Sequence, residues 1–229
     1  MVRPKRTEQQ ADLQDAIKET AWKQIAAFGA PTLSLRAIAR ELGITAPAIY
    51  NYFPRRDDLV IALIIDAYTS FGDSQIAARD ALPADDLTGR LNAIGLAYRQ
   101  WALTHPQRYL LIFGTPIPGY EPPAEKVSPS GARSLSALTS VIEALRLAGK
   151  LRAEHFPQVQ GEYKSALEVW ATHAGNVNAL SLSVAMLIWA RVHGIVSLEI
   201  TGGMPPFGEN GDGLYQYEMD SLSKQFIKE

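Results

Sequence analysis

Apolar residues recur at helical spacing along almost the whole chain, and no segment shows the strict alternation expected of a half-buried strand. Glycine and proline interrupt this pattern where helix ends and connections are expected. The expected helices cover about residues 8–28 and 35–42, a short segment after Thr45, a helix from 56 to a stop before Pro83, and then 86–103, 106–113, 129–148, 158–174, 181–200 and 213–227. The pattern predicts an all-α fold.

Residues 34–59 predict two short helices joined by a glycine turn. Ser34 is a good N-cap for the first helix, and Gly43 ends it. Apolar residues at i, i+3, i+4 and i+7 give this helix one stripe to bury: Leu35, Ile38, Ala39 and Leu42. After the turn, Thr45 can cap the second helix, and Pro47 lies in a first turn that needs no amide donor.

The second helix can bury Ile49 and Phe53, which lie four residues apart, and leave its other faces for DNA. Small residues at its N-terminal end suit close approach to bases, while phenols, an amide and arginines suit contacts with phosphates and bases. These residues are Ala46, Pro47, Ala48, Tyr50, Asn51 and Tyr52, with Arg36, Arg55 and Arg56 on the flanks. The alternative is an ordinary helical hairpin within a larger bundle.

The same stretch resembles the tetracycline-repressor (TetR) family of transcription regulators. The matching positions are Ile38, Ala39, Gly43, Ile44, Ala48, Ile49, Tyr50, Tyr52, Phe53, Arg56 and Leu59. The resemblance implies a helix-turn-helix DNA-binding domain at residues 10–70 and a ligand-binding and dimerisation domain at 71–229. By this likeness the DNA-facing residues are Arg36, Thr45, Ala46, Pro47, Tyr50, Asn51 and Tyr52, with Arg56 at a phosphate-binding position where the family usually has lysine.

The resemblance implies a homodimer that binds a palindromic operator in double-stranded DNA and is released by a small ligand. The last long helices mix small side chains with Trp170 and Trp189, which suits close packing either between two copies or within one chain. The triplet Trp189, His193 and Gly194 also resembles a TetR subgroup named for a Trp-His-Gly signature. Before these helices, the segment Gly114 to Ser130 holds five prolines and is expected to be a packed loop.

Aromatic residues in the expected second domain suit a pocket for an apolar or aromatic effector. The candidate lining residues are Tyr68, Phe71, Tyr98, Trp101, His105, Tyr109 and Phe113. The alternative for each ring is a place in the core, because aromatic residues at helical spacing usually pack there. A regulator without a small-molecule effector therefore remains an alternative at this stage.

Composition limits the other classes of function. The net charge is −2, with nine basic and seven acidic residues at 1–60, which gives +2 there and −4 over the remainder. This balance excludes a histone-like binder that relies on bulk positive charge and fits a DNA-facing end on an acidic body. The chain has no cysteine, which excludes disulfides and thiolate metal sites. No run approaches roughly 18 continuous apolar residues, so a cytoplasmic protein without a membrane partner is expected.

An enzyme is the rival class of function. The chain has four histidines, at 105, 155, 173 and 193, but no HExxH, GxSxG, Walker or GxGxxG motif. We expect no catalytic residue, metal or cofactor, and we interpret His193 as a hydrogen-bonded packing residue of its helix.

Overall fold

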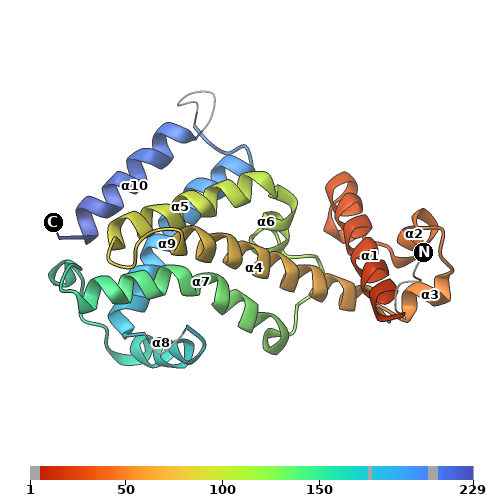
Figure 1. Cartoon of the computed structure of the whole chain (residues 1–229), viewed down its shortest axis with the longest axis horizontal. Coiled ribbons are helices and arrows are strands. Elements are labelled where there is room, and N and C mark those ends of the chain that lie inside the picture. Colours follow the sequence, from red (N-terminus) through yellow and green to blue (C-terminus); the bar gives the residue numbers. More distant parts are fainter. Residues whose placement is uncertain (1–5, 175–176, 206–210, 229) are drawn as a thin grey trace. The chain divides into compact units, whose positions relative to one another are not determined.

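The computed structural model describes residues 6–174, 177–205 and 211–228, and these residues form ten α-helices and two short 3-10 helices (Figure 1). The elements follow the order α1 (Arg6–Phe28), η1 (Ala30–Thr32), α2 (Leu35–Glu41), α3 (Ala46–Tyr50), α4 (Arg56–Asp80), α5 (Leu87–Thr104), α6 (Pro106–Phe113), α7 (Ala124–Leu147), η2 (Ala153–His155), α8 (Gly161–Ala174), α9 (Ala179–Ile200) and α10 (Asp212–Phe226). In these ranges extended backbone pairs at an isolated antiparallel bridge between Leu151 and Ile227. The predicted all-α fold is confirmed.

The segment from Gly114 to Ser130 is partly helical, and the prediction of a loop throughout was wrong. Helix α7 begins at Ala124 and contains Pro129. The proline lies near the start of the helix, where its missing N–H removes one bond to the carbonyl four residues earlier. The carbonyl of Pro123 accepts from the amides of Lys126 and Val127 and so begins the helix one turn before the proline.

The chain divides into two compact units whose segments alternate along the sequence. The first unit contains the chain through Ala67 together with Gln107–Val127, and the second contains Tyr68–Pro106 and the chain from Ser128 onwards. The sequence suggested one division between residues 70 and 71. The structure has a division close to that point, but the segment 107–127 belongs to the first unit.

The first unit is built on helices α1, α2 and α3, with the beginning of α4. Contacts join α1 to α2 and α2 to α3. Its core consists of fully buried aliphatic side chains, including Ile17, Ile38, Ile49, Leu59 and Leu63. Burying a side chain of this kind contributes about 1.5–3 kcal/mol, so these residues fix the small α2–α3 hairpin on the longer helices.

The second unit is organised around α9, which contacts α5, α8 and α10 (Figure 1). Helix α10 approaches α5 closely at Gly95, where an added Cβ would collide with the Met219 side chain. The hydroxyl of Tyr215 donates to the carbonyl of Gly95 in the same place. Arg99 joins these helices further by ion pairs of 2.6 Å each to Glu199 and Asp212.

Helices α4 and α9 are long and apolar enough to cross a membrane by length and composition, with mean hydropathies of 1.2 and 1.6 over their most apolar windows. About half of each window is buried within the chain, 50% in α4 and 44% in α9. Core helices of soluble proteins have the same character, so this finding is weak evidence for a membrane span.

Candidate nucleic-acid interface

The α2–α3 hairpin is built from local signals in the sequence. Ser34 caps α2, with its Oγ accepting from the amide of Ala37 at 3.4 Å. At the other end Gly43 has φ +65°, a conformation that favours glycine. The amide of Ile44 bonds the carbonyl of Ala39 at 3.0 Å, and the amide of Gly43 bonds that of Arg40 at 3.3 Å. This pair of bonds is a Schellman motif, which ends α2 and turns the chain sharply into α3.

Helix α3 is short, and its burial is one-sided. Thr45 occupies the N-cap position in extended conformation but makes no side-chain capping bond within the described hairpin, and Pro47 lies in the first turn. Ile49 in the helix and Phe53, which follows the helix, are 0% and 3% exposed, respectively, as the spacing predicted. The opposite side of the helix therefore faces away from the core.

The residues predicted to face DNA lie on this outward side and on the adjoining surface of α2. Exposed members are Arg36, Thr45, Ala46, Pro47, Tyr50 and Asn51, and Tyr52 is half-buried. Their side chains offer a guanidinium, a hydroxyl, an amide and phenols beside small residues. This arrangement suits a helix that enters a groove with its N-terminal end, while its flanks hydrogen-bond phosphates.

Arg56 has a different setting from the other predicted residues. Its Nη2 donates to the carbonyls of Ala30 and Pro31 at 3.0 and 3.2 Å, and Nη1 lies 3.6 Å from Asp57 Oδ1. The Nε atom is buried without a hydrogen-bond partner in the described part of the chain. The guanidinium thus joins the first turn of α4 to η1, and 30% of the side chain is exposed.

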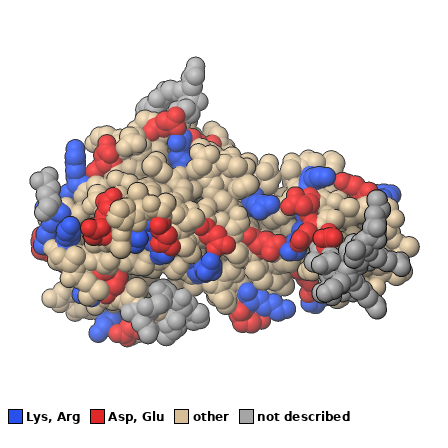
Figure 2. All heavy atoms as spheres, in the orientation of Figure 1, with Lys and Arg blue, Asp and Glu red and all other residues tan. Residues whose placement is uncertain are grey.

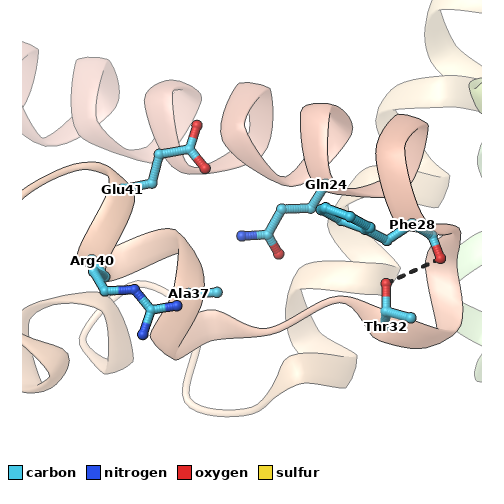
Figure 3. A pocket seen from close by; sticks show the side chains of 6 residues that line it. All are labelled: Gln24, Phe28, Thr32, Ala37, Arg40 and Glu41. Atoms are coloured by element: carbon cyan, nitrogen blue, oxygen red, sulfur yellow. Dashed lines mark hydrogen bonds between the residues drawn. The ribbon is translucent and has the colours of Figure 1, made fainter.

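A hollow of about 480 Å³ lies between α1 and α2 in the same unit. Figure 3 shows the side chains that line it: Gln24, Phe28, Thr32, Ala37, Arg40 and Glu41. Gln24 Oε1 accepts from the Ser34 amide at 3.3 Å, so this lining group also supports the cap of α2. Arg40 follows Arg36 by four residues, so both lie along one side of α2 and the hollow borders the predicted DNA-facing surface.

The surface charge is mixed. On the face drawn in Figure 2, acidic and basic side chains are interspersed on a surface that is otherwise uncharged. The drawn face therefore has mixed charge rather than a broad basic surface.

The seven aromatic residues predicted to line a pocket fall into both units. Tyr109 and Phe113 belong to the first unit, and their rings lie 5.2 Å apart. In the second unit, the Phe71 ring lies 4.9 Å from that of Tyr98 and 5.0 Å from that of Trp101. The ring of His105 lies 5.4 Å from Trp101, and Tyr68 is half-buried. The rings of this second-unit cluster pack on one another, as core aromatics do.

His193 is hydrogen-bonded at both ring nitrogens. Its Nδ1 lies 2.8 Å from the Tyr98 hydroxyl, its Nε2 lies 3.3 Å from Ser197 Oγ, and its ring stacks on Trp189 at 4.7 Å. Burial lowers the pKa of His193 below its usual value. These contacts agree with a packing role. Among the described residues, no group of three or more histidine, aspartate or glutamate side chains is placed to hold a metal ion.

A short outward-facing helix held by a capped partner helix and a Schellman turn defines a helix-turn-helix DNA-binding protein. Residues 17–63 match the family model described as bacterial regulatory proteins, tetR family, and residues 91–222 match the tetracyclin repressor-like C-terminal domain. The chain belongs to the TetR family and is a DNA-binding transcriptional regulator, and these matches point to a transcription factor rather than an enzyme.

Known proteins resemble the chain over most of its length. The HTH-type transcriptional regulator Rv1816 of Mycobacterium tuberculosis (strain ATCC 25618 / H37Rv) is 34% identical over 200 residues, which cover 86% of this chain and 85% of that protein. The crystal structure of SCO4313 is 34% identical, with a TM-score of 0.76, and the match covers 96% of this chain and 98% of that one. The TetR family regulator PfmR from Thermus thermophilus shares the fold at 14% identity, with a TM-score of 0.59 and coverage of 91% and 97%.

Proposed function

We propose that the protein is a homodimeric, ligand-released repressor in the cytoplasm that binds a palindromic operator through α2 and α3. The observation that supports this DNA-binding surface most directly is the one-sided burial of α3, where Ile49 is buried and Tyr50 is exposed, with Phe53 buried just after the helix. Arg36, Thr45, Tyr50 and Tyr52 are assigned to phosphates. Ala46 and Pro47 are assigned to close approach, and Asn51 to a base edge. Arg56 is assigned a supporting contact at the start of α4.

Dimerisation is proposed through α8 and α9, because both expose large apolar side chains. Tyr163 and Trp170 on α8 are 53% and 48% exposed, and Leu187 and Leu198 on α9 are 50% and 44% exposed. A protein that binds a palindromic operator requires twofold symmetry. An exposed apolar face on α8 and α9 supplies that symmetry when two copies of the chain pack together through it. Gly194 lies between the two leucines at helical spacing, and a Cβ added there has no heavy atom within 4 Å. That open space suits close approach of a partner helix.

Two substitutions on α9, Leu187→Lys and Gly194→Ala, test this interface by sedimentation, and Tyr217→Lys on α10 is the control. Leu187→Lys is expected to convert the dimer to monomer at micromolar concentration, whereas Tyr217→Lys, at a 73% exposed position on α10, leaves it dimeric. Gly194→Ala fits the single chain and improves helix propensity by about 0.5–1 kcal/mol, yet it is expected to weaken the dimer because the added methyl meets the partner helix. A dimer unaffected by both α9 variants would place the interface elsewhere.

The proposed effector is a small apolar or aromatic molecule that binds in the second unit. The support is the apolar character of the cluster of Phe71, Tyr98 and Trp101. Its polar atoms are already hydrogen-bonded within the chain, the Tyr98 hydroxyl to His193 and the Trp101 indole N–H to Ser70 at 3.0 Å. To change operator occupancy from 99:1 to 1:99, the effector must bind the released state about 10⁴-fold more tightly than the DNA-competent state. Helix α4 is the proposed route of the change, because it begins beside the reading hairpin and ends in the second unit.

A second candidate is a regulator without a small effector. It is favoured by the packing of the same rings against one another at 4.9–5.4 Å. Selection of bound genomic fragments, followed by a screen for compounds that release the selected DNA, separates the candidates. Hydrogen exchange at α4 and α3 on adding a releasing compound tests the route, and unchanged exchange at both helices would exclude it.

A further inference from the structure

Helix α8 (Gly161–Ala174) is attached to its own chain through one buried side chain in the part whose side chains the structure describes, residues 161–171. That side chain is Leu167, which is 7% exposed and packs in a small cluster with Leu182 of α9. Ala171 is half-buried, and the other residues of 161–171 are exposed. A single chain therefore covers little of this helix.

The exposed part of α8 carries an apolar stripe. Tyr163, Ala166 and Trp170 recur at i, i+3 and i+7, which places them on one side of the helix. Tyr163 and Trp170 are 53% and 48% exposed, and Ala166 is exposed as well. Ser165 and Glu168 lie on the side away from Tyr163 and Trp170. Helix α8 is thus amphipathic, but its own chain leaves the apolar stripe uncovered, whereas such a stripe ordinarily packs against another element.

Local interactions give α8 little stability of its own. The helix has 14 residues, and isolated helices shorter than about 12–15 residues are marginal in water even when they are rich in alanine. Lys164 Nζ lies 3.7 Å from Glu168 Oε1, but both side chains are exposed, and lysine before glutamate is the less favourable order along a helix. Burial of Leu167 alone does not offset the conformational entropy that is lost when this helix is ordered.

A second copy of the chain has the surface that this stripe needs. Helix α9, which contacts α8, has an exposed apolar stripe of its own that mixes large and small residues: Leu187, Ala190, Gly194 and Leu198. Neither stripe contains a charged side chain, so the surface that covers them has to be apolar. In a twofold dimer the partner presents the same pair of stripes, and small residues beside large ones allow the helices to pack closely.

We infer that α8 folds onto its own chain only when a second copy packs against the stripe of Tyr163, Ala166 and Trp170. Dimerisation and the folding of α8 are then one event, with residues 161–174 unfolded in the separated chain and helical in the dimer. The inference rests on the proposed dimerisation through α8 and α9. Because the interface has to offset the ordering of α8 in both chains, the dimer dissociates more readily than one whose interface is formed beforehand.

Two substitutions at Ser165 test the inference without altering the stripe, because this exposed residue lies on the other side of α8. Alanine favours a helix over glycine by a factor of about four to five. If α8 folds during dimerisation, both chains contribute this factor, and the dimer dissociation constant of Ser165→Gly is expected to be about 20-fold that of Ser165→Ala. Sedimentation of the full-length proteins over a dilution series measures both constants, and equal values would overturn the inference.

Gln216 on α10 provides the matched control. It is exposed in the same way, but α10 is anchored within its own chain by buried side chains that include Tyr215, Met219 and Leu222. Helix α10 is therefore expected to be folded in the monomer as well as in the dimer. The variants Gln216→Ala and Gln216→Gly are expected to have the same dimer dissociation constant.

Hydrogen exchange gives a second measurement. In diluted, monomeric protein the amides of α8 are expected to exchange on the order of 100-fold faster than in concentrated, dimeric protein, while those of α10 keep their protection. The Leu187→Lys monomer, which is altered only on α9, is expected to match the diluted protein. Equal protection of α8 in monomer and dimer would contradict the inference alone. A protein that is monomeric at every concentration would instead contradict the proposed dimerisation.

Discussion

Replacing Arg56 by methionine separates a structural role from a phosphate contact. In the structure the guanidinium donates to the carbonyls of Ala30 and Pro31 at 3.0 and 3.2 Å and so joins η1 to α4. A hydrogen bond from a charged group contributes about 1.5–3 kcal/mol to stability. Both bonds come from one nitrogen, and part of the cost is offset because the unpartnered Nε is removed as well. We therefore expect Arg56→Met to lower the free energy of unfolding by about 1.5–3 kcal/mol.

For a chain of this size, each kcal/mol corresponds to about 2–4 °C in Tm, so the expected loss is about 3–12 °C. Arg36→Ala is the matched comparison, because Arg36 is exposed on α2 and is assigned to phosphate. That variant is expected to keep its Tm but to reduce the salt slope of DNA affinity by about one. Calorimetry and fluorescence anisotropy at several salt concentrations measure the two quantities.

The assignment would be refuted if Arg56→Met reduced the salt slope without changing the Tm and Arg36→Ala lowered the Tm without changing the salt slope. An Arg56→Met protein with an unchanged Tm and a salt slope reduced by about one would identify Arg56 as a phosphate ligand, as the family position of a lysine suggests. Arg56→Lys refines the result, because a lysine keeps the charge but cannot reproduce the planar fork of the guanidinium. We expect Arg56→Lys to leave the salt slope unchanged and to recover the Tm only in part.

Other substitutions give separate tests. Tyr50→Ala is expected to weaken binding to all duplexes and Asn51→Ala to reduce sequence preference as well, by about 1–3 kcal/mol each, and equal anisotropy titrations for a folded Tyr50 variant would exclude that contact. Hydrogen bonds from Arg146, and then from Ser181, lower the pKa of Glu143 to about 2. Its carboxylate therefore stabilises the fold above pH 4.5, and this contribution is lost as pH falls towards about 2. Glu143→Gln should flatten that part of a pH–Tm curve, and a curve parallel to that of the unaltered protein would contradict the assignment. Burial lowers the pKa of His193, so stability should decline as pH falls below 6.5, and His193→Asn should remove that decline in the same measurement.

The structure of the α2–α3 hairpin could be predicted from the sequence because the residues that determine it lie close together in the chain. The Ser34 cap, the turn at Gly43 and the buried pair Ile49 and Phe53 act within a few residues of one another, so periodicity and capping rules are sufficient to place them. The exposed character of Tyr50 then follows, since each residue assigned to the core leaves the opposite side of a short helix to solvent.

The ion pair in which Arg108 Nη2 on α6 lies 3.7 Å from Glu19 Oε1 on α1 did not follow from the sequence, because it joins distant residues. Arg108 and Glu19 are far apart in the chain, and neither helical periodicity nor residue type links them. The prolines of 114–130 predicted a loop throughout, but Pro129 falls where α7 loses only one backbone bond. Periodicity also placed the aromatic residues at buried positions without separating rings that line a cavity from rings that pack on each other.

Whether the rings line a cavity or pack on each other determines how the proposed effector can bind. Each aromatic pair contributes about 0.5–1.5 kcal/mol beyond its burial, so the Phe71–Tyr98, Phe71–Trp101 and Trp101–His105 contacts together hold the cluster by about 1.5–4.5 kcal/mol. A ligand that enters among these rings must replace those contacts, which an aromatic or apolar molecule does and a strongly polar one does not. The shift from 99:1 to 1:99 requires about 5.5 kcal/mol of differential binding. In the proposed mechanism the rings separate in the released state, and the closed cluster then supplies part of the discrimination against ligand in the DNA-competent state.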